Sequence, residues 1–332
     1  MTRAVAVAQD APLLEVRNLS VRFRMGDADM LAVRRVDLEI RRGEVLGIIG
    51  ESGSGKSVTG LAILRLLPSH AMVTADYLRF GGRDLQELDD QAFRQLRGTH
   101  LAMVFQDPVG AFNPAKTIGW HLDRIIARAG TRAARQGVDI AQDAKRWLTD
   151  VGIPNPERIL PLYPHQLSGG MLQRALIALA VALQPDLLIA DEPTTNLDNI
   201  VERQIIGVLR RLKNTLGSAI IFITHDISLA VGLCDRIAVM YAGEIVETAP
   251  ASSLFRNPAH PYTAGLIETA RQLDDRVARL REIPGELPSG AASGSGCLFA
   301  PRCGFAVDAC KAAPPPEIAL APNHTVRCIR HG

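Results

Sequence analysis

The chain has no long hydrophobic run and no excess of either charge. The most apolar run, Ala175–Leu183, is far shorter than the roughly 20 residues that cross a bilayer, and Gln9 and Asp10 interrupt the apolar N-terminus before a signal-peptide core could form. The 37 basic and 35 acidic residues leave a net charge of +2, which gives no basic field for nucleic acid. We therefore expect a globular chain that stays inside the cell, with no membrane helix of its own and no nucleic-acid partner.

Hydrophobic patterns predict an α/β fold. Residues 13–23 and 31–40 alternate apolar with polar side chains, which is typical of half-buried antiparallel strands. Short, nearly continuous apolar runs interleave with helical patterns further on, and they predict a mostly parallel sheet with helices on both faces. These runs are residues 44–50, 101–105, 187–190, 219–224 and 237–241. Strand patterns vanish between residues 113 and 183, so we expect an inserted helical subdomain there.

The segment GESGSGKS, Gly50–Ser57, matches the phosphate-loop pattern G-x-x-x-x-G-K-[ST]. It lies between an apolar strand and a helix expected over residues 56–67, a context that a chance glycine-rich turn would lack. Lys56 would neutralise the β- and γ-phosphates, and the Ser57 hydroxyl would ligate Mg²⁺. The residues expected at the nucleotide are Gly50, Ser52, Gly53, Ser54, Gly55, Lys56, Ser57 and Val58.

A second glycine-containing loop, LSGGMLQR at residues 167–174, precedes a long apolar helix. Such a loop is suited to a phosphate, yet its own half of the chain offers none. We expect it to reach the nucleotide of another subunit, with ATP held between the two. The residues predicted to take part are Ser168, Gly169, Gly170 and Gln173.

Polar residues with catalytic chemistry follow three of the predicted strands. Asp191 ends an apolar strand where a carboxylate could hold Mg²⁺, and the neighbouring Glu192 could polarise an attacking water. Gln106 closes another strand, and its amide could reach Mg²⁺ or that water. His225 follows residues 219–224 and could hydrogen-bond the γ-phosphate. The alternatives are a solvated strand end for the acids, a turn residue for Gln106 and a structural role for His225.

The order of these motifs resembles the ATP-binding subunits of ABC transporters. The motifs are GESGSGKS, VFQDP at residues 104–108, LSGGMLQR, LLIADEP at 187–193, TNLD at 195–198 and ITHD at 223–226. The resemblance implies a P-loop ABC cassette with an N-terminal antiparallel β subdomain. It also implies that Phe23 stacks on adenine, that Asp198 lies at the subunit boundary, that Gln106 reports to the membrane subunit and that His225 senses the γ-phosphate. Asn196 stands where the family more often has alanine.

The segments NPAHPYT (257–263) and IPGELP (283–288) resemble the C-terminal extension of oligopeptide and dipeptide importer ATPases, a branch that includes nickel importers. This resemblance implies an ATPase that powers peptide import from the cytoplasmic face of the inner membrane. Its expected partners are a second, homologous ATPase subunit, two permease subunits and, indirectly, an extracytoplasmic solute-binding protein. The expected parts are a flexible terminus (1–12), an ATPase domain (13–256, with the helical insertion at 113–183) and the extension (257–332). His260 is expected to be structural.

Four of the five cysteines, Cys297, Cys303, Cys310 and Cys328, lie close to the C-terminus, whereas Cys234 is expected to be a small buried residue. Disulfides are disfavoured in a reducing compartment, so the group indicates a metal, either zinc or an iron-sulfur cluster, with four thiols that bind no metal as the remaining alternative. The spacings contain none of the C-x-x-C pairs common in zinc ribbons. Arg302 is expected beside a thiolate, where its charge would stabilise an anionic cluster. The resemblance implies a 4Fe-4S cluster, which we expect alongside ATP and Mg²⁺.

Three other functions remain open at this stage. A nickel or other small-solute importer would carry the same cassette and extension. A soluble ABC-type ATPase is disfavoured because the chain has one cassette and no long heptad segment between its motifs. A non-hydrolytic regulatory module is disfavoured by the intact Glu192 and His225.

Overall fold

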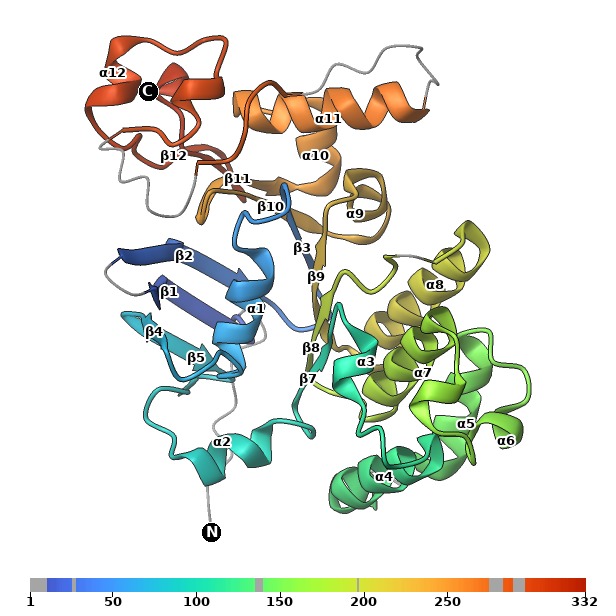
Figure 1. Ribbon diagram of the computed structural model, residues 1–332. Coiled ribbons are helices and arrows are strands. Elements are labelled where there is room, and N and C mark those ends of the chain that lie inside the picture. Colours follow the sequence, from blue (N-terminus) through green and yellow to red (C-terminus); the bar gives the residue numbers. More distant parts are fainter. Residues whose placement is uncertain (1–10, 26–27, 135–139, 196, 275–282, 289–295) are drawn as a thin grey trace. The chain divides into compact units, whose positions relative to one another are not determined.

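The computed structural model describes residues 11–25, 28–134, 140–195, 197–274, 283–288 and 296–332 (Figure 1). The chain forms two compact units. The first comprises residues 1–41, 45–86 and 222–332, and the second comprises residues 42–44 and 87–221. Strand β9 (Ala219–Thr224) is divided between them after Ile221. Among the described helices, none is both long enough and apolar enough to cross a bilayer.

An antiparallel sheet forms the N-terminal part of the first unit. Its long strands are β1 (Leu14–Met25) and β2 (Ala28–Ile40), which pair from Leu14 opposite Ile40 to Met25 opposite Ala28. Alternate β1 side chains are fully buried, Leu14 with Val16 before a shift in register and Leu19 with Val21 after it. The predicted half-buried strands are therefore confirmed. Three short strands that the pattern did not predict complete this sheet: β4 (Ala71–Thr74), β5 (Tyr77–Phe80) and β6 (Arg83–Asp84).

The second sheet of the first unit carries the phosphate loop. Its strands run in the order β12 (Ile318–Ala321), β13 (His324–Val326), β11 (Glu244–Pro250), β10 (Arg236–Tyr241), β3 (Val45–Ile49) and the second half of β9. Strands β3 and β10 are parallel, whereas β10–β11, β11–β13 and β12–β13 are antiparallel. The C-terminal extension thus adds two strands to the sheet from which the phosphate loop leaves.

Helices flank these sheets in the first unit. They are α1 (Lys56–Ile63), α9 (Ile227–Leu233), α10 (Ala251–Arg256), α11 (Pro261–Asp274), α12 (Asp308–Ala312) and the 3-10 turns η2 (Ala300–Arg302) and η3 (Ile329–His331). Helix α1 is shorter than the predicted range of residues 56–67. It ends early because Arg65 adopts a left-handed backbone conformation, with φ of 49°, which a helix cannot continue through.

The second unit combines short parallel strands with a group of helices (Figure 1). Strands β7 (Leu101–Val104) and β8 (Leu187–Asp191) are parallel and entirely buried, and the first half of β9 belongs to the same unit. No strand occurs between residues 113 and 183 in the part that the structure describes. Its helices are α2 (Asp90–Leu96), α3 (Pro108–Ala111), α4 (Ile118–Ala134), α5 (Ile140–Asp150), α6 (Pro156–Ile159), η1 (Pro164–Gln166), α7 (Gly169–Ala182) and α8 (Asn199–Leu216).

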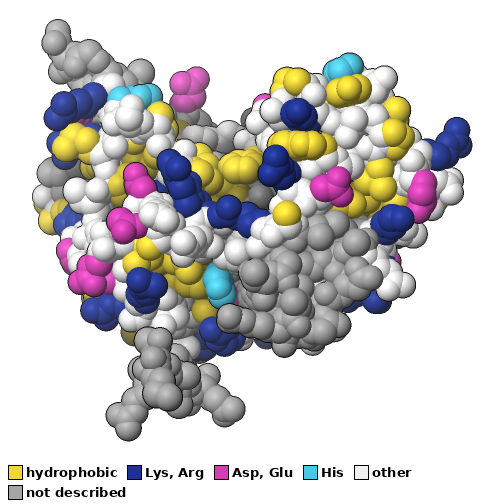
Figure 2. Space-filling view, turned by 90° about the horizontal axis from the view of Figure 1, so that it is seen from below, with side chains coloured by type: hydrophobic (Ala, Val, Ile, Leu, Met, Phe, Trp, Pro, Cys, Tyr) yellow, Lys and Arg dark blue, Asp and Glu magenta, His cyan; other side chains and the backbone are white. Residues whose placement is uncertain are grey.

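The predicted α/β class is confirmed, and both kinds of predicted sheet are present. Buried strands β3, β7, β8 and β9 begin and end within about one residue of the apolar runs that predicted them. Basic, acidic and hydrophobic side chains are mixed on the face shown in Figure 2, as the near balance of 37 basic and 35 acidic residues leads one to expect.

Candidate active site

The phosphate loop connects β3 to α1 and requires glycine at specific positions. Gly55 has φ of 102°, and a Cβ atom there would lie 2.6 Å from the Ala32 carbonyl oxygen and 2.8 Å from Met240 Cε. Gly50 has φ of 155°, and a Cβ atom there would overlap the Met240 carbonyl oxygen. A side chain at either position would clash with buried neighbours and strain the backbone. These two glycines are therefore needed by the fold of the loop itself.

The side chain of Lys56 folds back onto the start of the phosphate loop. Its ammonium donates hydrogen bonds to the carbonyl oxygens of Gly50 (2.7 Å) and Glu51 (2.8 Å), and the residue is only 5% exposed. It is the first residue of α1, whose N-cap, Gly55, provides no side-chain hydrogen bond. The N-cap residue thus occupies none of the N–H groups of the first turn of α1, and a helix start favours an anion.

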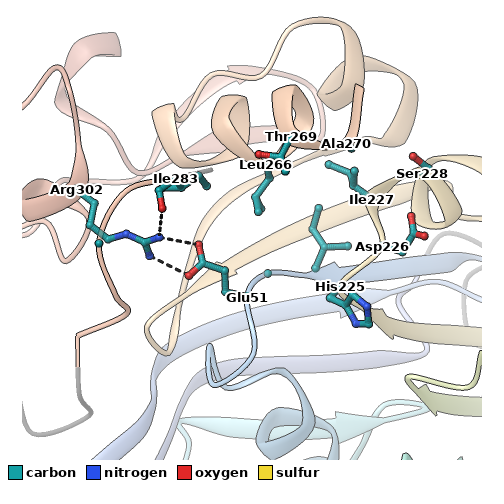
Figure 3. Close-up of a pocket in the computed structure, with 13 residues that line it drawn as sticks. Glu51, His225, Asp226, Ile227, Ser228, Leu266, Thr269, Ala270, Ile283 and Arg302 are labelled. Carbon is teal, nitrogen blue, oxygen red and sulfur yellow. Dashed lines mark hydrogen bonds and ion pairs between the residues drawn. The ribbon is translucent and has the colours of Figure 1, made fainter. Parts of the chain in front are cut away.

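His225 faces the same part of the first unit as the phosphate loop. A cavity of about 610 Å³ is lined by Gly50 and Glu51 from the loop and by His225 and Asp226 from the end of β9 (Figure 3). Strands β3 and β9 both end at this cavity, which is why residues far apart in the chain meet there. Phe23 lies on β1, half-buried, with its ring 5.8 Å from that of His70. Its stacking on adenine stays a prediction.

Two of the predicted catalytic residues meet in the second unit. Gln106 follows β7, and its amide donates to Glu192 Oε2 at 3.4 Å, while Thr195 Oγ1 donates to the same oxygen at 2.9 Å. Glu192 is 9% exposed and has φ of 44°, in the left-handed region that a residue with a side chain occupies at a cost of about 1 kcal/mol. Asp191, at the end of β8, is also buried. The pairing holds the Glu192 carboxylate in one orientation beside an amide donor.

The LSGG loop forms the N-terminus of α7. Ser168 Oγ accepts a hydrogen bond from the Met171 N–H at 3.3 Å and so caps the helix, and both Ser168 and Gly169 are exposed. No atom lies within 4 Å of a Cβ added at Gly169. Packing among the described residues therefore does not require glycine at this position, and its contact with a nucleotide stays a prediction.

Gln173 and Asp198, also predicted to contact a nucleotide, form hydrogen bonds within the second unit. Gln173 is 4% exposed, and its amide donates to the Pro193 carbonyl oxygen at 3.2 Å, so in this structure it packs α7 against the segment after β8. Asp198 caps α8 by accepting from the N–H groups of Ile200 and Val201, each at 3.0 Å. Their contacts with a nucleotide stay predictions. Asn196 lies outside the described residues.

Buried hydrogen bonds hold the NPAHPYT segment (257–263) of the extension in place. The fully buried Glu247 carboxylate accepts from the N–H groups of Ala259 (2.9 Å) and His260 (2.8 Å) and lies 2.9 Å from His324 Nε2. His260 Nδ1 accepts from the Tyr262 N–H at 3.1 Å. Burial lowers the pKa of His260 to about 4, so the ring is neutral near pH 7. The expected structural role of His260 fits these contacts.

The expectation for Arg302 was wrong. Its guanidinium forms an ion pair with the Glu51 carboxylate of the phosphate loop, at 2.9 and 3.2 Å, instead of compensating a thiolate. Tyr262 also contacts the loop, because its hydroxyl accepts a hydrogen bond from the Glu51 N–H at 2.9 Å. Both contacts join residues more than 200 positions apart, and no local sequence pattern signals them.

The four C-terminal cysteines line one cavity together with apolar residues such as Phe299 and Ile329. All four are free thiols, and burial raises the pKa of Cys297 and of Cys328. Among the described residues, no three His, Cys, Asp or Glu side chains are grouped so that they could hold a metal ion. The choice between zinc, an iron-sulfur cluster and no metal at these thiols stays a prediction.

Comparison with known families and proteins identifies two matching regions. The family described as "ABC transporter" matches residues 33–195, and the family described as "Oligopeptide/dipeptide transporter, C-terminal region" matches residues 246–310. The chain is 43% identical to the dipeptide transport ATP-binding protein DppD of Escherichia coli K12, over 95% of this chain and 96% of the relative. It is 41% identical to a putative peptide import ATP-binding protein of Brucella melitensis, over 96% and 97%.

Solved structures with the same fold include a dimeric bacterial ABC transporter cassette, and the same cassette as a dimer in a post-hydrolysis state bound to ADP and Pi. Each matches with a TM-score of 0.61 and 26% identity, over 72% of this chain and 98% of the other.

Proposed function

The chain belongs to the family of ABC transporter ATP-binding proteins that carry the oligopeptide/dipeptide transporter C-terminal region, and from this premise we propose that it hydrolyses ATP to power the import of peptides through a membrane transporter. The observation that carries this function is the 43% identity to a dipeptide transport ATP-binding protein, which extends over the cassette and the extension alike. The proposed parts are the ATPase domain at 13–256, with its helical insertion at 113–183, and the extension at 257–332.

In this function the chain's own residues bind ATP and activate water. The phosphate loop and Lys56 would hold the β- and γ-phosphates, and Phe23 would stack on the adenine ring. Glu192, oriented by Thr195 and Gln106, would accept a proton from the water that attacks the γ-phosphorus while the bond to the β-phosphate oxygen breaks and ADP leaves. His225 would hydrogen-bond the transferred phosphate. Mg²⁺ neutralises phosphate charge when bound, and Ser57, Gln106 and Asp191 would hold it.

The LSGG loop supports a dimer with ATP between subunits. The exposed N-terminus of α7, capped by Ser168 and with open space around Gly169, fits a phosphate delivered by another cassette. The matching solved cassette is described as a dimer. We propose that the partner is a second, homologous ATPase subunit and that the pair docks on two permease subunits at the cytoplasmic face of the inner membrane. A solute-binding protein outside would supply the peptide.

A reconstituted transporter tests this function. ATP hydrolysis should rise several-fold when the subunit is assembled with its permeases and a peptide-loaded binding protein, because closure of the cassettes is then coupled to the transport cycle. Phosphate release in proteoliposomes and uptake of labelled dipeptide are the two measurements. Stimulation by a nickel complex with no response to peptides would favour the nickel alternative, and indifference to the permeases would contradict a transport role.

For the C-terminal cysteines we propose a 4Fe-4S cluster held by Cys297, Cys303, Cys310 and Cys328. Support comes from four free thiols around one cavity with apolar walls. A cluster of several irons needs its ligands further apart than a single ion does, which is compatible with the absence of any close group of three among the described residues. The four cysteines would hold the cluster as thiolates, and the bound cluster would crosslink the extension.

Anaerobic purification tests the cluster. The protein should be brown, should absorb near 400 nm and should contain about four irons per chain, whereas a Cys303→Ser variant should contain less iron. Iron analysis by mass spectrometry and the optical spectrum are the measurements. A colourless, iron-free protein with four titratable thiols at these positions would rule the cluster out.

A further inference from the structure

Glu51 of the phosphate loop is held at two points by the C-terminal extension. Its backbone N–H donates to the Tyr262 hydroxyl at 2.9 Å. Its carboxylate accepts two hydrogen bonds from Arg302, at 2.9 and 3.2 Å, which are drawn in Figure 3. Glu51 is the residue directly after Gly50, at the start of the loop. The extension therefore fixes both the backbone and the side chain of one phosphate-loop residue.

The Arg302 contact is geometrically specific. The Arg302 side chain is 6% exposed and that of Glu51 is 27% exposed, so the two-pronged ion pair is largely removed from solvent. The remaining guanidinium donors reach the carbonyl oxygens of Ile283 (3.2 Å) and Pro284 (2.9 Å), also in the extension. A buried guanidinium without its carboxylate is strongly unfavourable, so displacement of either partner is costly.

The hydrogen bond between Tyr262 and Glu51 is also shielded from solvent on the Tyr262 side. Tyr262 is fully buried at the start of α11, and burial raises the pKa of its hydroxyl, which therefore stays protonated. Its ring packs against Tyr241, with centroids 4.7 Å apart, and against Phe299 at 5.4 Å. Phe299 belongs to the extension, between Cys297 and Cys303.

Arg302 is positioned by the turn that joins two of the cysteines. The Ala300 N–H donates to the Cys297 carbonyl oxygen at 3.0 Å, and the Cys303 N–H donates to that of Ala300 at 3.3 Å, which folds this stretch into the 3-10 turn η2. Arg302 leaves this turn toward Glu51. A change in the conformation of the turn therefore moves the guanidinium.

The contacts continue from Glu51 to the phosphate-binding lysine. The Glu51 carbonyl oxygen accepts from Lys56 Nζ at 2.8 Å. A shift of Glu51 would therefore change a hydrogen bond of the ammonium that is proposed to bind the β- and γ-phosphates. From this chain of contacts we propose that Tyr262 and Arg302 are positioning residues for the phosphate loop, and that they couple ATP binding to the fold of the cysteine-bearing extension. The inference rests on the proposed ATP site and not on the cluster.

Two single substitutions test the coupling in the full chain. Tyr262→Phe removes one hydroxyl and keeps the packing, and Arg302→Gln removes the ion pair. Each should raise the Kd of a fluorescent ATP analogue about tenfold, within the usual range of coupling between sites, and should speed hydrogen exchange in the peptide that covers residues 50–57. Tyr77→Phe and Arg271→Gln are matched controls. They lose hydrogen bonds to Arg17 and to the Phe255 carbonyl, away from the loop, and should bind the analogue like the wild type.

A double variant separates positioning from general damage to the fold. If Arg302 acts through Glu51, adding Arg302→Gln to a Glu51→Gln chain should change the Kd little further, because the partner carboxylate is already absent. Equal losses in the two backgrounds would contradict the inference. Unchanged Kd and exchange in both Tyr262→Phe and Arg302→Gln would also contradict it. Melting temperatures identify a variant that fails to fold, in which case Arg302→Lys, which keeps the charge and loses the second hydrogen bond, replaces Arg302→Gln.

Reciprocity gives an independent readout in iron-free protein. Coupling between two sites is mutual in free energy, so bound ATP should stabilise the turn η2 that precedes Cys303. Alkylation of the Cys303 thiol should then slow several-fold in the wild type and not in Arg302→Gln. Equal alkylation rates with and without ATP in the wild type would overturn the inference. If the protein is found to bind no cluster, the measurements of Kd, hydrogen exchange and alkylation still test the inference. A wild type that binds no ATP would instead refute the proposed ATP site.

Discussion

Replacing Glu192 with glutamine is expected to lower the rate of ATP hydrolysis about a thousandfold while ATP remains bound. Glutamine keeps the size of the side chain and can still accept from Thr195 and Gln106, but its amide cannot take a proton from water. Because turnover is blocked after binding, the ATP-bound dimer should accumulate. Phosphate release and retention of radiolabelled ATP on a gel-filtration column measure the two effects.

Glu157→Gln is the matched control for this variant. Glu157 is exposed in the same unit and forms an ion pair with Lys145 at 3.3 Å, so its loss should leave turnover unchanged. If Glu192→Gln hydrolysed ATP at the wild-type rate, Glu192 would have no part in activating water, and another base would have to be sought near Gln106.

Replacing Gly169 with aspartate is expected to abolish ATP-driven association of the cassettes, lowering their affinity by at least about a hundredfold. The new carboxylate would stand at the exposed N-terminus of α7, where the proposed function places the phosphates of the partner's ATP, and like charges would repel. ATP binding by the isolated chain should be unaffected, because the function proposed above assigns the contacts with the chain's own ATP to the phosphate loop and not to Gly169. Analytical ultracentrifugation with the partner cassette, in Mg-ATP, measures the association.

Gly207→Asp provides the control for this prediction. Gly207 is an exposed glycine within α8 of the same unit, and no atom lies within 4 Å of a Cβ added there. The Gly207→Asp substitution introduces the same negative charge into a helix, at a position where no ligand is proposed. ATP-driven association should then match the wild type. Dimers of Gly169→Asp as tight as the wild type would show that the LSGG loop does not meet ATP.

The elements that the sequence predicted correctly share a local physical cause. Buried strands such as β8 and β9 follow from continuous apolar runs, and the phosphate loop follows from glycines whose backbone angles other residues rarely adopt. The short strands β4–β6 and the extension's β12 and β13 were not predicted, because two to four residues carry too little periodicity to be distinguished from a loop.

Contacts between residues far apart in the chain could not be predicted from the sequence. The Glu192 carboxylate meets Gln106, 86 positions earlier, only because β7 and β8 are adjacent and parallel in the sheet. Arg302 was expected beside a cysteine because cysteine is its neighbour in the chain, yet its guanidinium pairs with Glu51, 251 positions away. A long side chain can point away from its sequence neighbours, and its direction depends on which buried carboxylate the fold brings within reach.

The sequence by itself determined the α/β class, because buried strands and helices follow from local periodicity. It also gave the order of the motifs, whose resemblance to a known family indicates the residues that we propose to bind phosphate and activate water. The tertiary structure alone decided that Tyr262 and Arg302 of the extension hold Glu51 of the phosphate loop, and that four separated cysteines line one cavity. The physical reason that only the tertiary structure could decide these contacts is that they form between buried groups. Hydrogen bonds and ion pairs become specific where the fold excludes water, and which distant groups share such a place is set by the packing of the whole unit.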